Sequence, residues 1–245
     1  MRYLIVLLFF VVSCKPIDNG VDAQKVIDNS INKSNLQVIE NSNLSFSFRK
    51  NNYIAKRNNG NYEFQKISKK DSVIIKDVLS NEGVKRYVND SLIQLSEKDK
   101  KGFGDSVNSV HYFAVLPYGL NAPAARKKML EPVIIKGKTY YKVQVTFSEE
   151  DGGTDFDDVF IYWFAKEDFK LTYLAYKYHT NGGGVRFRDV KKENLVNGIR
   201  FVDYNNYKPL DKNIDFYTID KLYEDGKLKK ISEIVLNNIE IKELN

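Results

Sequence analysis

The sequence predicts a mainly β protein, in which about a dozen strands form a curled antiparallel sheet or half-barrel. Apolar runs with a period of two residues are joined by tight-turn pairs, and strand-favouring Tyr (16) and Phe (15) are abundant. Strands do not alternate one-for-one with helices, which argues against a parallel α/β barrel. Because large antiparallel sheets curl or close, we expect helices on the concave face.

The N-terminal residues have the features of an export signal. Arg2 is followed by the apolar run Leu4 to Val12, which is shorter than the about 20 residues needed to span a bilayer. Val11-Val12-Ser13-Cys14 resembles the bacterial lipobox, and this resemblance implies that the Cys14 thiol is lipidated and the chain cut before it. The alternative is a free or buried thiol. We expect residues 1–13 to be a signal peptide, 14–21 a lipidated tether and 22–245 one half-barrel domain.

Composition excludes several function classes. Cys14 is the only cysteine, so the chain after lipidation offers no thiol for redox, nucleophilic or metal chemistry. The net charge of +6 is spread over scattered lysines, with no block of five like charges. Nucleic-acid binding needs clustered positive charge, so we expect no nucleic-acid partner. We also expect no cofactor.

The first half of the chain predicts a helix followed by strands. Ala23, Val26, Ile27 and Ile31 share one helical face over 22–35, and Asp22 can cap that helix. Alternating patterns then predict a strand at 45–49, a hairpin at 53–67 turning at Asn58-Asn59-Gly60, a strand at 72–80, and a hairpin at 84–96 turning at Asn89-Asp90.

A helical interval interrupts the strands. Apolar spacing predicts a helix over 105–115, following Phe103 and ended by Pro117, and Asn121 can cap a short second helix over 122–130. The helices at 22–35, 103–115 and 122–130 are expected to cover the concave face. Further strands are predicted at 133–147 (turning at Lys136-Gly137), 158–165, 169–180, 184–190, 196–208 (near Asn197-Gly198), 214–219 and 230–241.

This order of parts resembles the lipoprotein-carrier superfamily of the Lol type, whose half-barrels hold acyl chains on an apolar concave face. A second resemblance is carried by Asn81-Glu82-Gly83 and by the stretches 108–121, 155–163, 179–189 and 197–209. Through these, nearly the whole chain after the tether resembles an uncharacterised flavobacterial-type outer-membrane lipoprotein family. That family has no established activity, so the resemblance implies no specific function.

The two histidines are candidate site residues. His111 lies on the expected helix beside Tyr112, and His179 ends a strand before three glycines. We count His111, Tyr112, Tyr118 and His179 among the candidate ligand-binding residues; the alternative for each histidine is a hydrogen-bonded structural role. The two are too far apart in sequence for an i, i+4 zinc pair, and no serine lies in a GxSxG context.

An acidic loop and a glycine-rich loop offer charged groups. Asp155, Asp157 and Asp158 belong to the acidic loop, where Asp151, Asp155 and Asp157 could hold Ca²⁺ through oxygen ligands; the alternative is a solvated connection. Arg186 and Arg188 share one strand face and could bind a carboxylate, phosphate or polar head group. The alternative is that they pair with Asp155, Asp157 or Asp158. Five tyrosines could frame such a head group or pack within the sheet: Tyr173, Tyr176, Tyr178, Tyr204 and Tyr207.

These observations lead to one main functional hypothesis. We expect an outer-membrane lipoprotein of the cell envelope, monomeric and anchored by its lipid, that binds an amphipathic or lipid ligand and is not an enzyme. One alternative is a hydrolase or lyase that acts on a small polar or glycan substrate through His179 and nearby carboxylates. Another is a structural envelope component. The sequence leaves the membrane face open.

Overall fold

The computed structural model describes residues 21–148 and 157–244, which form two seven-stranded antiparallel sheets. Sheet A has the order β14 (Leu236–Glu243), β1 (Ser42–Phe48), β2 (Asn51–Asn58), β3 (Asn61–Lys70), β4 (Val73–Ser80), β5 (Gly83–Val88), β6 (Ser91–Ile93). Sheet B has the order β13 (Leu228–Ile234), β12 (Ile199–Pro209), β11 (Gly184–Val196), β10 (Leu171–Tyr178), β9 (Val159–Ala165), β8 (Lys138–Phe147), β7 (Ala125–Ile135). The mainly β, curled and open architecture confirms the expected fold class.

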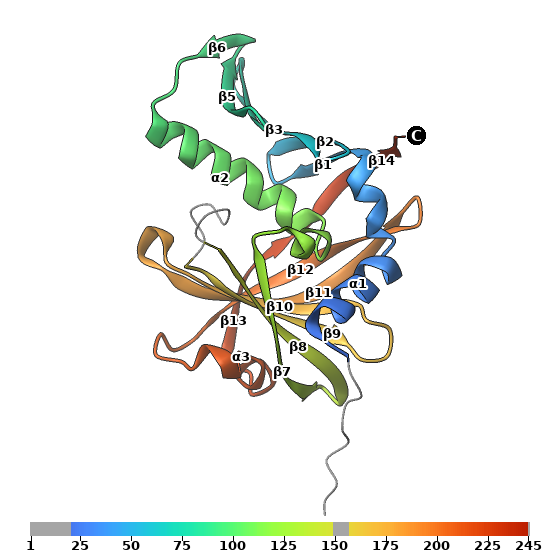
Figure 1. The fold of residues 1–245 in the computed structure, drawn as a ribbon. Helices are drawn as coiled ribbons and strands as arrows, with labels where there is room; N and C mark the ends of the chain where they lie inside the picture. The colour runs from blue at the N-terminus through green and yellow to red at the C-terminus, as the bar shows by residue number, and fades with distance from the viewer. Residues whose placement is uncertain (1–20, 149–156, 245) are drawn as a thin grey trace, which may run out of the picture.

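The two sheets are joined by two strands, β13 and β14, that follow each other almost without interruption along the chain. β13 ends sheet B, and after Val235 the chain enters sheet A as β14, which pairs with β1. The buried Asp203 carboxylate of β12 accepts a hydrogen bond from the Leu236 N–H at 2.9 Å and so fixes the crossing. Figure 1 shows sheet A above sheet B, with the red strand rising between them.

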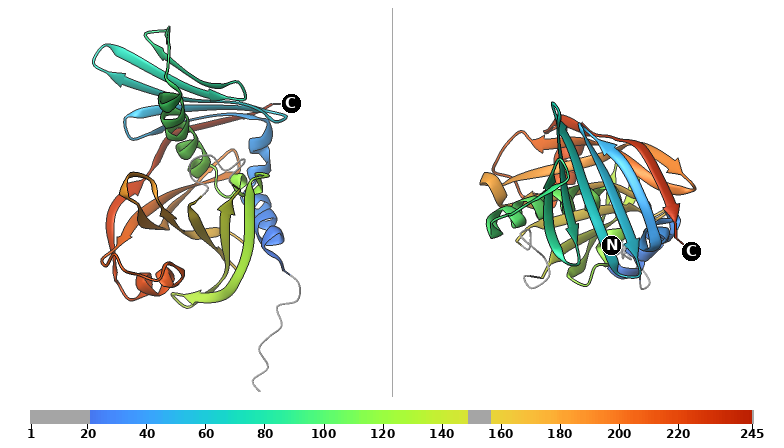
Figure 2. Two further views of the ribbon diagram at one scale, coloured as in Figure 1. Left: turned by 60° about the vertical axis from the view of Figure 1, so that its left-hand side comes forward. Right: turned by 90° about the horizontal axis from the view of Figure 1, so that it is seen from above.

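Two helices pack against the sheets. α1 (Ala23–Lys33) begins at Asp22, whose side chain accepts a hydrogen bond from the Lys25 N–H, and it buries Val26 and Ile27. α2 (Glu97–Ala114) packs on the inner face of sheet A at β3, β4 and β5. Figure 2 shows α2 between the splayed sheets and α1 lower down, beside β7 of sheet B. The expected helix at 22–35 is therefore confirmed, whereas α2 starts earlier than the sequence indicated.

Three expected elements differ in the structure. The predicted helix at 122–130 is wrong, because a short 3₁₀ helix, η2 (Tyr118–Asn121), leads into strand β7, which pairs with β8. The predicted strand at 214–219 is also wrong, since those residues form η5 (Phe216–Thr218) and begin α3 (Ile219–Glu224). The single strand expected at 230–241 is divided between the two sheets. The described residues also include the short helices η1 (Leu36–Asn41) and η4 (Thr180–Gly182).

Sheet B is buried on both faces. Its inner residues, such as Tyr162 and Phe164, join the main core with sheet A and the helices. Its outer residues, such as Ile161 and Trp163, form a second core with Phe216 and Ile219 from η5 and α3. Because side chains alternate between faces, β9 is apolar at every position. Because η5 and α3 cover the outer face of sheet B, an internal ligand site is expected between the two sheets.

Candidate functional site

A cavity of about 390 Å³ lies between the sheets beside the C-terminal half of α2. Its walls come from α2, from β9 to β12, and from the ends of β1, β13 and β14. Polar and apolar side chains meet here, and the polar lining is Arg49, Ser109, Asp158, Thr180, Arg186, Arg188 and Asn206. We call this space cavity 1. Its apolar lining is Phe48, Val110, Phe113, Ala114, Phe160, Tyr176, Tyr178, Val202, Tyr204, Ile234 and Leu236.

Arg186 and Arg188 both face cavity 1 because they are two residues apart on β11. Arg188 is only 7% exposed, and its guanidinium lies 4.3 Å from the Phe113 ring centre. Its Nη2 donates to the Tyr176 hydroxyl at 3.0 Å, but its Nε has no hydrogen-bond partner. Arg186 donates to the Val185 carbonyl at 2.8 Å and lies over the Tyr178 ring.

Within the described part of the chain neither arginine forms an ion pair with a carboxylate, and their hydrogen-bond partners are the Val185 carbonyl and the Tyr176 hydroxyl. The expected alternative, pairing with Asp157 or Asp158, is therefore not found, and Asp155 lies outside the described residues. A buried cation without a counter-ion is costly unless an anion is supplied from elsewhere. The arrangement thus favours a carboxylate, phosphate or sulfate group in cavity 1.

His179 and Asp158 lie together at the rim of this cavity. The Asp158 carboxylate accepts the His179 backbone N–H at 3.1 Å, and its Oδ1 is 3.5 Å from His179 Nδ1. Burial raises the pKa of Asp158, whereas the contacts with His179 lower it. The His179 side chain is 54% exposed. Asp157 is exposed beside them.

The expected tyrosine frame is split between the two faces of sheet B. Tyr176, Tyr178 and Tyr204 line cavity 1. Tyr173 and Tyr207 instead lie on the outer face, in the second core. The Tyr207 hydroxyl donates to Asp189 at 3.1 Å there. Only the inner three are therefore placed to contact a molecule in cavity 1.

A second cavity, of about 650 Å³, lies on the other side of the C-terminal half of α2; we call it cavity 2. Tyr112 and Tyr118 line it, which brings two more of the expected site residues to an internal surface. The Tyr112 and Tyr162 hydroxyls are 3.0 Å apart, and the Tyr118 hydroxyl donates to Glu40. Gly119 is required here because a Cβ would lie 2.8 Å from the Tyr112 ring.

Arg57 is a residue of cavity 2 that the sequence analysis missed. Its guanidinium lies 4.5 Å from the Phe64 ring centre, and the side chain is 8% exposed. Burial lowers its pKa to about 10. A signal was available, because the period-two pattern places Arg57 on the same face as the buried Tyr53 and Ala55.

His111 lies in the core and does not line either cavity. It is fully buried, its Nε2 is 3.0 Å from the Gln65 carbonyl oxygen, and the Phe46, Tyr53 and Phe64 rings surround it. Burial lowers its pKa to about 4. The structure thus places His111 in the structural role that was the alternative for this residue.

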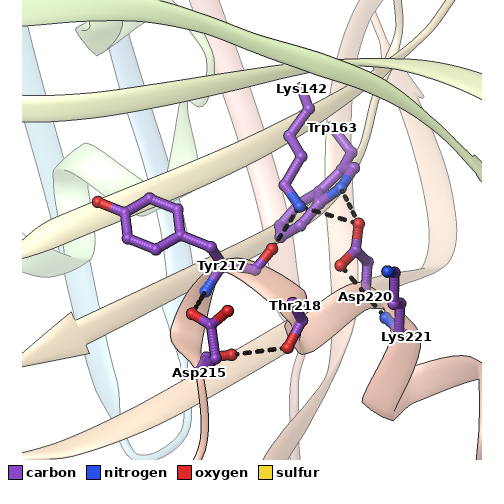
Figure 3. Close-up of polar contacts among 7 residues, drawn as sticks. All are labelled: Lys142, Trp163, Asp215, Tyr217, Thr218, Asp220 and Lys221. Carbon is purple, nitrogen blue, oxygen red and sulfur yellow. Dashed lines mark hydrogen bonds and ion pairs between the residues drawn. The ribbon is translucent and has the colours of Figure 1, made fainter.

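A buried ion pair lies on the outer face of sheet B. Lys142 of β8 donates to the Asp220 carboxylate at 3.0 Å and to the Tyr217 carbonyl at 2.7 Å. Figure 3 shows Trp163 beside this pair, with its indole N–H directed at Asp220. Both charged side chains are almost fully buried and line none of the cavities described above. The pair therefore attaches α3 to the sheet.

The described residues offer neither a metal cluster nor a membrane-spanning helix. Within 21–148 and 157–244 no group of three His, Cys, Asp or Glu residues is placed to hold a metal ion. Asp151 and Asp155 of the suggested Ca²⁺ site lie outside these ranges, as does Cys14. In the same ranges, no helix combines the length and the apolar character needed to cross a bilayer.

The fold and cavities define an open two-sheet β protein with internal space for a ligand. The chain belongs to a family described as "Family of unknown function (DUF6503)", which matches residues 2–236. No curated protein matches the sequence.

Two solved structures share the fold at very low sequence identity. The chain is similar to a DUF1329 family protein from Desulfovibrio piger, with 9% identity, a TM-score of 0.51, and 89% and 92% of the two chains covered. It is also similar to a LolA superfamily protein from Nitrosomonas europaea, with 10% identity, a TM-score of 0.52, and 92% and 96% covered. These likenesses confirm the expected Lol-type fold.

Proposed function

We propose that this protein binds an amphipathic ligand with an anionic head group in cavity 1. Arg186 and Arg188 hold the head group, and the aromatic and aliphatic walls hold the apolar part. The observation that carries this proposal is the Arg188 side chain, which is 7% exposed, has an Nε without a hydrogen-bond partner, and forms no ion pair with a carboxylate among the described residues. A volume of about 390 Å³ lies within the usual range of small-molecule sites, roughly 300–1,000 Å³.

The proposal includes a place in the cell envelope. The segment 1–13 directs export, Cys14 carries the lipid anchor, and residues 14–21 tether a monomeric domain, 22–245, to the outer membrane. The sequence features of residues 1–14 support this localisation, as does the resemblance to flavobacterial-type outer-membrane lipoproteins. A lipid-binding role agrees with the Lol-type fold. The two internal cavities disfavour a purely structural envelope component, which would be expected to have a filled interior.

A second candidate function rests on the contact between His179 and Asp158. A half-exposed imidazole 3.5 Å from a carboxylate at a cavity rim is an arrangement used in general acid–base catalysis. This favours a hydrolase or lyase acting on a small polar or glycan substrate. Loss of such an activity in both His179→Gln and Asp158→Asn, with Arg188→Gln still active, would support this second function.

Native mass spectrometry tests the binding proposal. Residues 22–245 are purified gently from an envelope extract, and a co-purifying anionic lipid is expected. Arg188→Gln removes a charged hydrogen-bond donor, so we expect roughly tenfold to hundredfold weaker retention of that lipid. Lys192→Gln is the control, because it removes the same charge from an exposed position on β11. A mass without ligand, with no anionic lipid regained on incubation, would contradict the proposal.

A further inference from the structure

Cavity 2 takes no part in the function proposed above. It shares only Ser109, Phe113 and Phe160 with cavity 1, so the C-terminal half of α2 stands between the two spaces. Its volume of about 650 Å³ is within the range of small-molecule sites. The walls are mostly aromatic and small apolar side chains, including Tyr62, Phe64, Tyr112, Phe113, Phe147, Phe160, Ala122 and Ala124.

The cationic side chain in the described lining of this cavity is Arg57. It is more than nine-tenths buried, and its Nη1 has no hydrogen-bond partner. The guanidinium contacts the Phe64 ring face and lies 6.0 Å from the Tyr118 ring centre. Among the residues that the structure describes, no carboxylate reaches Arg57 within 4.0 Å. An aromatic face offsets part of the cost of burying a cation, but it does not supply the missing hydrogen-bond acceptor.

The nearest acid at this cavity is already engaged. Glu40 is exposed, and its carboxylate accepts the Tyr118 hydroxyl. Its charge favours the protonated guanidinium from a distance without bonding to it. Glu40 also sets a limit on the ligand. A phosphate monoester carries a charge of about −1.5 to −2, which one guanidinium cannot balance beside a glutamate.

We infer that cavity 2 is a second ligand site, for a free carboxylic acid with an apolar body, whose carboxylate pairs with Arg57. A carboxylate supplies one negative charge and two acceptor oxygens, which match a single guanidinium. The aromatic walls take the apolar body. The chain therefore has two separate anion-binding centres, Arg186 with Arg188 in cavity 1 and Arg57 in cavity 2.

The probe for this site is dodecanoate labelled with ¹³C at its carboxyl carbon, titrated into the full chain and followed by NMR. Because cavity 1 can also take a carboxylate, we expect the cavity 2 signal to be the bound carboxylate resonance that persists in Arg188→Met and whose affinity falls at least tenfold in Arg57→Met. Lys56→Met is the matched control, because Lys56 precedes Arg57 but faces solvent and pairs with Glu63 on the surface. The control should bind dodecanoate as the unmutated chain does.

Dodecanol provides a test that needs no variant. It has the same apolar body without the charge, so the unmutated chain should bind dodecanoate at least tenfold more tightly than dodecanol. Equal affinities would overturn the inference, as would unchanged dodecanoate binding in Arg57→Met. A resonance lost in Arg188→Met but kept in Arg57→Met would place the acid in cavity 1 and also overturn it. Failure here leaves the anionic-lipid test of cavity 1 unaffected, because that test depends on Arg188.

Discussion

The buried charged residues differ in whether the fold neutralises them. Arg200 is 4% exposed, and it has both a carboxylate partner, Glu193 at 2.9 Å, and a carbonyl partner, Leu171 at 3.0 Å. Arg57 and Arg188 are about as deeply buried but have no carboxylate partner in the described ranges. The same fold thus pairs one internal arginine with a carboxylate and leaves two others at cavity walls without one among the described residues. This contrast is why we assign the two unpaired residues to ligands.

His111 makes stability depend on pH in a defined direction. Its pKa falls from 6.5 to about 4 on folding, so the unfolded chain binds a proton at a higher pH than the folded chain. Stability contributed by neutral His111 is therefore present above pH 6.5, falls as the pH drops toward 4, and levels off below. The shift corresponds to a loss on the order of 3 kcal/mol.

Urea unfolding between pH 7 and pH 4 measures this effect. As the pH falls, the unmutated chain should lose unfolding free energy relative to His111→Phe, because phenylalanine cannot be protonated. Asn52→Gln is the control, since that residue is exposed and does not titrate, and it should keep the full pH dependence. Parallel curves for the unmutated chain and His111→Phe would show that the prediction is wrong.

The sequence predicts the position of a site residue where the two-residue period of a strand determines which face its side chain lies on. The two-residue spacing of Arg186 and Arg188 correctly placed both on one strand face. Arg57 was overlooked because a basic residue next to an Asn-Asn-Gly turn resembles an ordinary solvent-exposed position. His111 could not be assigned from the sequence, because its burial depends on β1, β2 and β3 packing around α2.

At the scale of elements, α2 depends on a close approach to sheet A. Gly104 permits this approach, because a Cβ there would lie 2.9 Å from Val84 Cγ2. Near the same helix end, the Arg86 guanidinium lies 3.3 Å from the Phe103 ring centre and is paired with Asp77. The N-terminal half of α2 is thus held by close packing against β4 and β5.

Replacing Gly104 with leucine should therefore destabilise the protein by about 1–3 kcal/mol through overpacking, although leucine is the better helix former. Gly102→Leu on the same helix is the matched control. A Cβ at Gly102 meets nothing within 4 Å, so this change should stabilise by about 0.5–1 kcal/mol. Thermal and urea unfolding compare the two. Equal effects at both positions would refute a close helix–sheet contact.

The hairpin turns could be predicted from the sequence, whereas the assignment of some segments as helix or strand could not. The residues at Asn59-Gly60, Asn89-Asp90, Lys136-Gly137 and Asn197-Gly198 all have positive φ, as hairpin turns of this kind require. The 122–130 segment is rich in alanine and lysine, but pairing of β7 with β8 overrides that helix preference. The start of α2 was missed because residues 97–104 contain two glycines and little apolar periodicity.

At the scale of the molecule, the two sheets are expected to unfold together. The main core contains residues from both sheets and both inner helices, and β13 continues directly into β14. Trp163, the only tryptophan, reports on sheet B alone, whereas far-UV circular dichroism reports on both sheets. The two probes should give coincident urea transitions. A fluorescence transition that precedes or follows the dichroism change would indicate separately stable sheets.

The crossing at Val235 has a consequence for how the chain matures. Ser42 of β1 pairs with Glu243 of β14, so an early strand obtains one of its two neighbours only after almost the whole described chain is available. Sheet B likewise lacks its edge until β13 has formed. Such distant pairings slow folding. A nascent chain should therefore complete its two sheets only after synthesis has passed residue 243, so neither sheet is finished while the chain is still being made.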